Sequence, residues 1–109
     1  MIYPMPLLIE VVEIRGRCPV YRVGSSIVLK EGYILDIAGN SAVCMHSLAS
    51  IFPYYVALSR GIKAADLGLS KGGTASDKAY VQCLDPCYIT GGGTVVFAIG
   101  AMPEGVAEA

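Results

Sequence analysis

The chain has 109 residues, of which 54% are hydrophobic and only 16% are charged, and its formal net charge is −1. This length predicts a single domain over residues 1–109, and the scattered, nearly balanced charges argue against nucleic acid as a partner. Because so few charged residues leave apolar surface exposed, the composition predicts a homo-oligomer with a sheet edge or a helix face as its seam.

The opening stretch, MIYPMPLLIEVVEI, contains no basic residue, and Glu10 and Glu13 interrupt its apolar run. It therefore fits neither a signal peptide nor a transmembrane helix, and no membrane partner is expected. A cytoplasmic location follows by default. In that compartment the four cysteines are expected to be thiols rather than disulfides.

Three strands are predicted in the first part of the chain. Residues 7–15 (LLIEVVEIR) are rich in β-branched side chains, and their nearly continuous apolar run is typical of a central strand. A loop follows that contains Cys18, which the next residue, a proline, forces into an extended conformation. Residues 25–30 and 33–37 are the second and third strands, joined by a turn.

The stretch from Asn40 to Gly61 has the clearest helical spacing in the chain. Apolar residues recur there at steps of three and four: Cys44, Leu48, Ile51, Phe52, Tyr55 and Leu58. This spacing predicts one apolar stripe that faces the core, with Asn40 or Ser41 as the N-terminal cap. Since proline breaks a helix, Pro53 predicts a first helix that ends near residues 51–52 and a second over residues 53–60.

A short helix is predicted over residues 62–69, followed by antiparallel strands over residues 78–84 and 94–99 and a frayed tail over residues 102–109. The TGGG segment between the last two strands is interpreted as a hairpin loop, because a phosphate loop would be followed by a helix. The expected fold is α+β. About five mostly antiparallel strands form one sheet or a partly open barrel, with the kinked helix and the short helix inserted between strands three and four.

The cysteines and the single histidine are the residues most suited to chemistry. Cys83 and Cys87 have the spacing of a zinc-ligand pair, and Cys18, Cys44 and His46 could complete a metal site. No second short-spaced pair supports this reading, and two residues along a helix would turn Cys44 and His46 about 200° apart. The sequence therefore favours no metal and identifies no cofactor.

A reactive thiol is the alternative. Cys44 lies in the predicted first turn of the helix, where the helix dipole favours a thiolate, and Cys18 lies among the basic residues 15, 17 and 22. No Asp or Asn is placed in the sequence to orient His46, so the constellation for acyl transfer is incomplete. The simpler interpretation is that Cys44 is a small core residue and that His46 is exposed.

Several segments in order resemble a family of small uncharacterised prokaryotic proteins. The matching segments are VVEIRGRCP, VGSSIVL, CMHSLASIFPYYVALSRG, AYVQCLDP and TGGGTVVFAI, within residues 8–99. The matching positions are Cys18, Pro19, Gly24, Cys44, Pro53, Cys83, Asp85, Pro86 and Gly92. The chain departs from the pattern at Leu84 and Cys87, where the family has Pro and Gly. The resemblance implies no activity or cofactor, but it weakens a four-thiolate zinc site and indicates the trio Cys18, Cys44 and Cys83.

Three hypotheses follow for the function. The first is an oligomeric binding module for a small molecule or a protein, with a site drawn from Arg17, Cys18, Cys44, Cys83 and Asp85. The second is a thiol-dependent enzyme or redox protein that uses Cys18 or Cys44, with His46 as a further catalytic candidate. The third is a metal-binding module built from Cys18, Cys44 and Cys83 with His46 or Cys87.

Overall fold

The computed structural model describes residues 3–37, 39, 42–72 and 77–102. The strands are β1 (Leu7–Gly16), β2 (Ser26–Lys30), β3 (Ile34–Asp36), β4 (Ala79–Gln82) and β5 (Gly93–Ala101). The helices are α1 (Met45–Ile51), α2 (Tyr55–Ser59) and α3 (Cys87–Thr90), with a 3₁₀ helix, η1, over Ala64–Leu67. Of the expected tail, residues 103–109 lie outside the described residues, and the N–H of Met102 donates to the carbonyl of Pro6.

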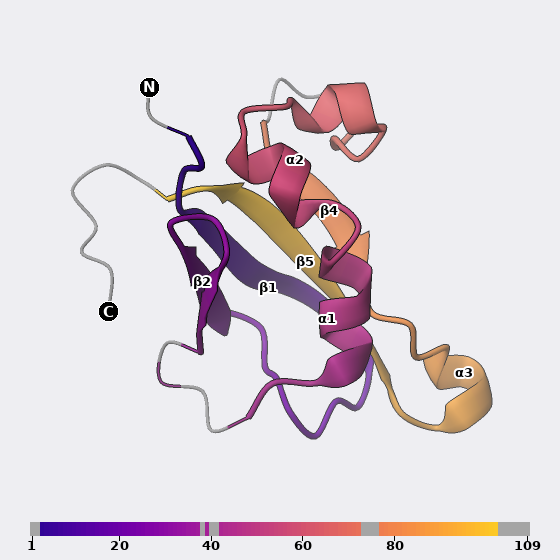
Figure 1. Ribbon diagram of the computed structural model, residues 1–109. Coiled ribbons are helices and arrows are strands. Elements are labelled where there is room, and N and C mark those ends of the chain that lie inside the picture. Colours follow the sequence, from indigo (N-terminus) through magenta and orange to yellow (C-terminus); the bar gives the residue numbers. More distant parts are fainter. Residues whose placement is uncertain (1–2, 38, 40–41, 73–76, 103–109) are drawn as a thin grey trace.

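All five strands form one open antiparallel sheet in the order β3-β2-β1-β5-β4, so the predicted α+β fold is confirmed, as a sheet rather than a barrel (Figure 1). β1 is central, as its apolar run predicts, and it pairs with β2 on one side and β5 on the other. In the part of the chain that the structure describes, no helix has the length and apolar character needed to cross a membrane.

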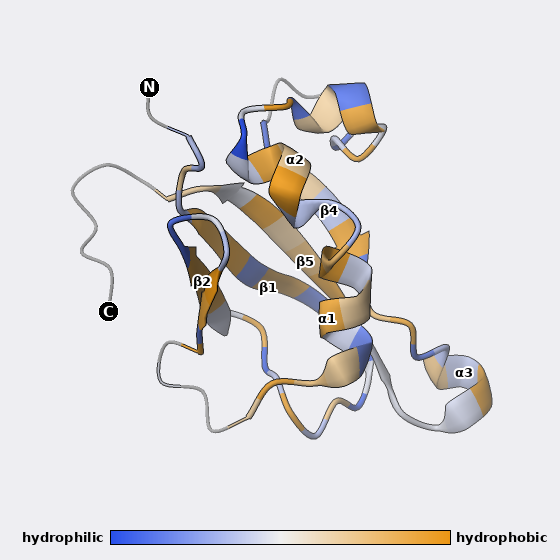
Figure 2. Ribbon diagram, in the orientation of Figure 1, coloured by the Kyte–Doolittle hydropathy of each residue, from blue (hydrophilic) through white to orange (hydrophobic). Residues whose placement is uncertain are grey.

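The core lies between one face of the sheet and the helices α1 and α2, which lie across it in Figure 1. Leu7, Ile9 and Val11 of β1 are buried in this layer, and the intervening residues are more exposed. In Figure 2 β1 is mostly coloured as apolar, with a few polar residues along it. A β-bulge at Val12 then shifts the register against β5, which leaves the Val12 side chain exposed.

Pro53 divides the central helical stretch as predicted. α1 ends at Ile51 and α2 begins at Tyr55, with a turn between them that the N–H of Tyr54 closes onto the carbonyl of Ile51 at 3.0 Å. Because proline has no amide proton, this turn costs the chain no backbone hydrogen bond at residue 53. The two short helices can therefore follow the twist of the sheet at different angles.

The predicted apolar stripe holds only in part for α1, and the predicted N-terminal cap is wrong. Its buried residues are Ser47, Ser50 and Ile51, and Phe52 is 55% exposed. Serine is tolerated in the core because the hydroxyls of Ser47 and Ser50 each donate to a carbonyl three residues earlier, at 2.6 Å. Cys44 holds the N-cap position, and the predicted caps at residues 40 and 41 lie outside the described residues.

Two further segments differ from the prediction. Residues 62–69 form only the short η1, and the connection between β4 and β5 contains α3, which the glycine-rich pattern did not predict. α3 projects from one end of the sheet (Figure 1), and none of its residues is buried. Since nothing in the core requires this helix, hydrophobic periodicity carries no signal for it.

Candidate functional site

A cavity of about 240 Å³ is lined by three of the four cysteines. The side chains come from the loop after β1, the start of α1, the end of β4 and the start of β5. We call this cavity the thiol pocket, and define it by Cys18, Tyr21, Cys44, His46, Ser47, Cys83 and Asp85. The fold thus brings together residues that are up to 67 positions apart in the sequence, counting from Cys18 to Asp85.

Cys18 is half-buried, and its sulfur accepts hydrogen bonds from two backbone amides. The donors are the N–H groups of Val20 at 3.4 Å and Tyr21 at 3.3 Å. The backbone of Cys18 also lies directly against β5, since a Cβ atom added at Gly93 would be 2.6 Å from the Cys18 nitrogen. The sulfur is therefore held in a fixed place on the pocket wall, beside two donors of partial positive charge.

Cys83 has a structural role. Its thiol is buried, accepts the N–H of Val95 at 3.2 Å and donates to the carbonyl of Gly93 at 3.5 Å. The N–H of Cys83 donates to the carbonyl of Val95 at 2.9 Å, which extends the pairing of β4 with β5. Both the donor and the acceptor capacity of this thiol are therefore used within the sheet. Cys83 forms the buried floor of the pocket and is not free to bond a ligand.

A buried tyrosine links the loop of Cys18 to the start of α1. The Tyr21 hydroxyl accepts the N–H of Cys44 at 2.9 Å and lies 2.7 Å from the Ser47 hydroxyl. Since Ser47 donates to the Cys44 carbonyl, Tyr21 donates to Ser47 and every group in this network has a partner. The Tyr21 ring also meets Phe97 edge-on, with centroids 5.6 Å apart. No periodic pattern marks Tyr21 in the sequence, although its hydroxyl determines how Cys18 and Cys44 face one pocket.

Removing this hydroxyl is expected to destabilise the protein. Tyr21→Phe leaves the Cys44 N–H without its acceptor and removes the hydrogen bond that the Ser47 hydroxyl accepts, so it should lower the free energy of unfolding by about 2 kcal/mol. Urea denaturation followed by circular dichroism measures this change. Tyr33→Phe is the matched control, because among the described residues the Tyr33 hydroxyl bonds only to exposed Glu31, at 3.3 Å. It should cost less than about 0.5 kcal/mol. Equal losses in the two variants would contradict the proposed network.

His46 lines the same pocket as Cys44, which the helical geometry did not predict. Cys44 has an extended backbone, with φ −88° and ψ 133°, so the rotation of 100° per residue does not apply across this pair. His46 itself is exposed in the first turn of α1. Asp85 lines the pocket too, but its carboxylate also accepts a hydrogen bond from the Thr90 hydroxyl, which ties down the loop around α3.

Two predicted candidates lie outside the thiol pocket. Arg17 is exposed and does not line it, and Cys87 lines a neighbouring cavity with Arg15 and Tyr88. Of the basic residues near Cys18, Arg15 pairs with Glu13 at 2.8 Å. The electropositive surroundings predicted for Cys18 are therefore partly neutralised.

The geometry does not support a metal centre. Within the described ranges, no group of three or more His, Cys, Asp or Glu side chains is arranged to hold a metal ion. A structural zinc site needs four ligands with zinc–sulfur bonds near 2.3 Å, so lining a common cavity is not sufficient.

Comparison of the chain with protein-family models, with curated proteins and with solved structures finds no match. The resemblance to small prokaryotic proteins therefore stays a prediction.

Proposed function

We propose that the protein is a binding module for a small molecule, with the thiol pocket as its site. The observation that carries the proposal is that Cys18, Cys44 and Cys83 reach one cavity from three separate segments, together with His46. At about 240 Å³ the cavity is smaller than the sites of drug-sized ligands, so we expect a compact ligand. Polarizable sulfur atoms on its walls favour a soft or electrophilic group.

A second candidate function is thiol chemistry at Cys18. The two amide donors directed at its sulfur favour this residue over the other pocket thiols, because such donors stabilise negative charge on the atom that attacks. Cys83 is less suited, since it is buried and bonded within the sheet. His46 lines the same pocket and is a candidate for the proton acceptor.

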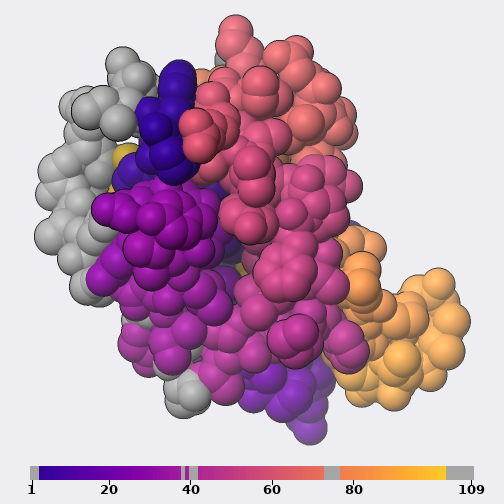
Figure 3. Space-filling model, in the orientation of Figure 1, coloured from indigo at the N-terminus to yellow at the C-terminus, as the bar shows by residue number. Residues whose placement is uncertain are grey.

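We further propose that the module works as a homo-oligomer in the cytoplasm. Free cysteines support that compartment. Exposed apolar side chains gather on β3 and its flanks and on the outer side of the helices: Tyr33, Ile34, Leu35, Ile37, Met45, Phe52 and Val56. Figure 3 shows that the surfaces of these two regions adjoin on one face of the molecule. An edge strand beside an apolar helix surface is suited to pairing with a second copy.

Timed alkylation with a maleimide tests the role of Cys18. Intact mass and peptide mapping identify the modified residue, first in native buffer and then in denaturant. We expect Cys18 to react first and Cys83 only on unfolding, and Cys18→Ser to abolish the fast phase. Cys87→Ser is the matched control and should leave that phase unchanged. Protection of all four thiols until unfolding would contradict thiol chemistry.

Native mass spectrometry of the same protein, purified without chelator, tests binding and assembly. We expect a mass above that of one chain, and a co-purified small ligand that is lost from Tyr21→Phe. A monomer would contradict the oligomer. A bound mass that survives both Cys18→Ser and Tyr21→Phe would place the ligand elsewhere and contradict the proposed site.

A further inference from the structure

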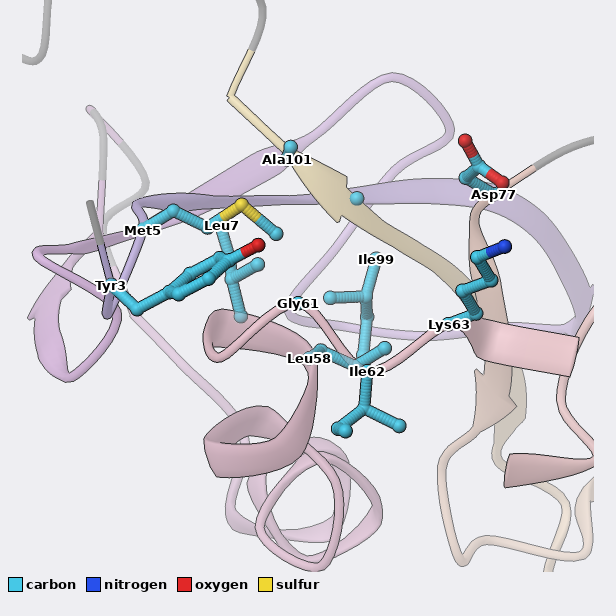
Figure 4. Close-up of a pocket in the computed structure, with 11 residues that line it drawn as sticks. Tyr3, Met5, Leu7, Leu58, Gly61, Ile62, Lys63, Asp77, Ile99 and Ala101 are labelled. Atoms are coloured by element: carbon cyan, nitrogen blue, oxygen red, sulfur yellow. The ribbon is translucent and has the colours of Figure 1, made fainter. Parts of the chain in front are cut away.

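A second cavity, of about 280 Å³, lies at the opposite end of β5 from the thiol pocket. The thiol pocket contacts Gly93 and Val95, whereas this cavity contacts Ile99 and Ala101. Val95 and Ile99, the nearest of these residues along β5, are four positions apart, which corresponds to about 13 Å. The two cavities are therefore independent sites. Three segments bound the second one: the N-terminal residues before β1, the connection from α2 to η1, and Asp77 before β4 (Figure 4).

The floor of this cavity is apolar. Leu7, Leu58 and Ile99 form it, and each is at most 5% exposed. Ile62 adds an apolar side chain that is 46% exposed, so it offers surface that a ligand could cover. Figure 4 shows Leu58, Ile62 and Ile99 grouped in the middle of the view. A branched hydrocarbon group of a few carbons is the chemistry that this floor would accept.

Tyr3 forms one wall and packs closely against Gly61. A Cβ atom at Gly61 would lie 2.6 Å from the Tyr3 hydroxyl and 2.8 Å from its ring, so the tyrosine side chain would have to shift. Gly61 also has φ +85°, a backbone conformation that favours glycine. The N–H of Met5 donates to the carbonyl of Ser59 at 2.7 Å, which fastens the same segment to α2. In Figure 4 the hydroxyl of Tyr3 points toward the middle of the cavity.

Two side chains of opposite charge lie on the side of the cavity across from Tyr3. Lys63 and Asp77 are both exposed and both line the cavity, and Figure 4 shows them together at its edge. No ion pair joins Lys63 to Asp77 within the described part of the chain. A ligand with one charge would be attracted by one of these groups and repelled by the other. A zwitterion would be complementary to both.

We propose that this cavity binds a small α-amino acid with an apolar side chain. Lys63 would receive the α-carboxylate, Asp77 the α-ammonium group, and the floor around Leu58 and Ile99 the side chain. The volume suits such a ligand, because it lies just below the range of drug-sized sites. With about nine non-hydrogen atoms in leucine, a Kd of about 1 mM or below is within reach.

Titration of the ¹⁵N-labelled protein with L-leucine, followed by amide NMR, tests the proposal. We expect saturable shifts at residues around Gly61 and Ile99. Two analogues each lack one charge: 4-methylpentanoate and 3-methylbutylamine should both bind at least about tenfold more weakly. L-Glutamate keeps both α-groups but has a polar side chain, and should bind as weakly. Equal binding of either single-charge analogue would overturn the assignment of the two charges.

Lys63→Met and Asp77→Asn provide two independent variants at exposed positions, and each should weaken leucine binding at least about tenfold. Asp66→Asn is the matched control, because Asp66 is exposed on η1 and does not line the cavity. Cys18→Ser should leave leucine binding unchanged, which separates this site from the thiol pocket. The absence of saturable shifts, or unchanged binding in both Lys63→Met and Asp77→Asn, would overturn the proposal.

Discussion

Phe97→Ala is expected to lower the free energy of unfolding by about 4 kcal/mol. Phe97 is 0% exposed and lies in β5, which pairs with β1 on one side and β4 on the other. Because three paired strands cannot close around the missing ring, the variant would keep a cavity as well as lose buried apolar surface. Denaturant unfolding followed by circular dichroism measures the loss.

The same substitution should loosen the thiol pocket, because the Phe97 ring supports Tyr21 edge-on at 5.6 Å. We therefore expect faster maleimide labelling of Cys83, which is otherwise buried below the pocket. Tyr88→Ala is the control, since Tyr88 is an aromatic residue that is 87% exposed and lies outside the proposed seam. It should cost less than about 1 kcal/mol. Equal destabilisation by the two substitutions would contradict the position of the core.

Gly93→Ala should both destabilise the protein and displace Cys18. An alanine Cβ at this position would lie 2.6 Å from the Cys18 nitrogen and 2.7 Å from the Arg17 carbonyl carbon. Both are backbone atoms, and the N–H of Arg17 is bonded to the carbonyl of Gly92 at 3.1 Å, so the loop cannot yield without breaking that contact. We expect a loss of about 3 kcal/mol in the free energy of unfolding.

Gly93 does not have a positive φ, so alanine fits its backbone conformation and the effect would come from the steric clash alone. Gly100→Ala in the same strand is the control, because its Cβ would meet the flexible side chain of Lys78 at 3.2 Å. It should change stability by less than about 1 kcal/mol. Peptide mapping after maleimide treatment should show altered reactivity of Cys18 in Gly93→Ala only. Unchanged stability and reactivity would contradict the close approach of the two backbones.

Much of the backbone could be predicted from the sequence, because its signals are local. The apolar run of β1 predicts a central strand, and β1 indeed pairs on both sides. Pro53 predicts the break between α1 and α2, since the loss of one amide proton acts at that position whatever the surroundings. The turn between β2 and β3 and the antiparallel pairing of β4 with β5 follow equally from short-range patterns.

The inward side of α1 could not be predicted in this way. Ser47 and Ser50 are buried because their hydroxyls find carbonyls within the helix, while the larger Phe52 turns outward. Hydrophobicity alone predicts the opposite arrangement, with Phe52 buried and the two serines exposed. The shared pocket of Cys44 and His46 was missed for a related reason, since the helix begins one residue after Cys44 and not before it.

The sequence by itself determined the segments that form the five strands, the break at Pro53 and the residue types available for chemistry, because these depend on neighbours along the chain. Only the tertiary structure decided that Cys18, Cys44 and Cys83 line one cavity while Cys87 lies in another. It also decided that Tyr3, Lys63 and Asp77 surround a second cavity. Such convergence depends on strand order and register across the sheet, which bring distant residues together through contacts that no local pattern encodes.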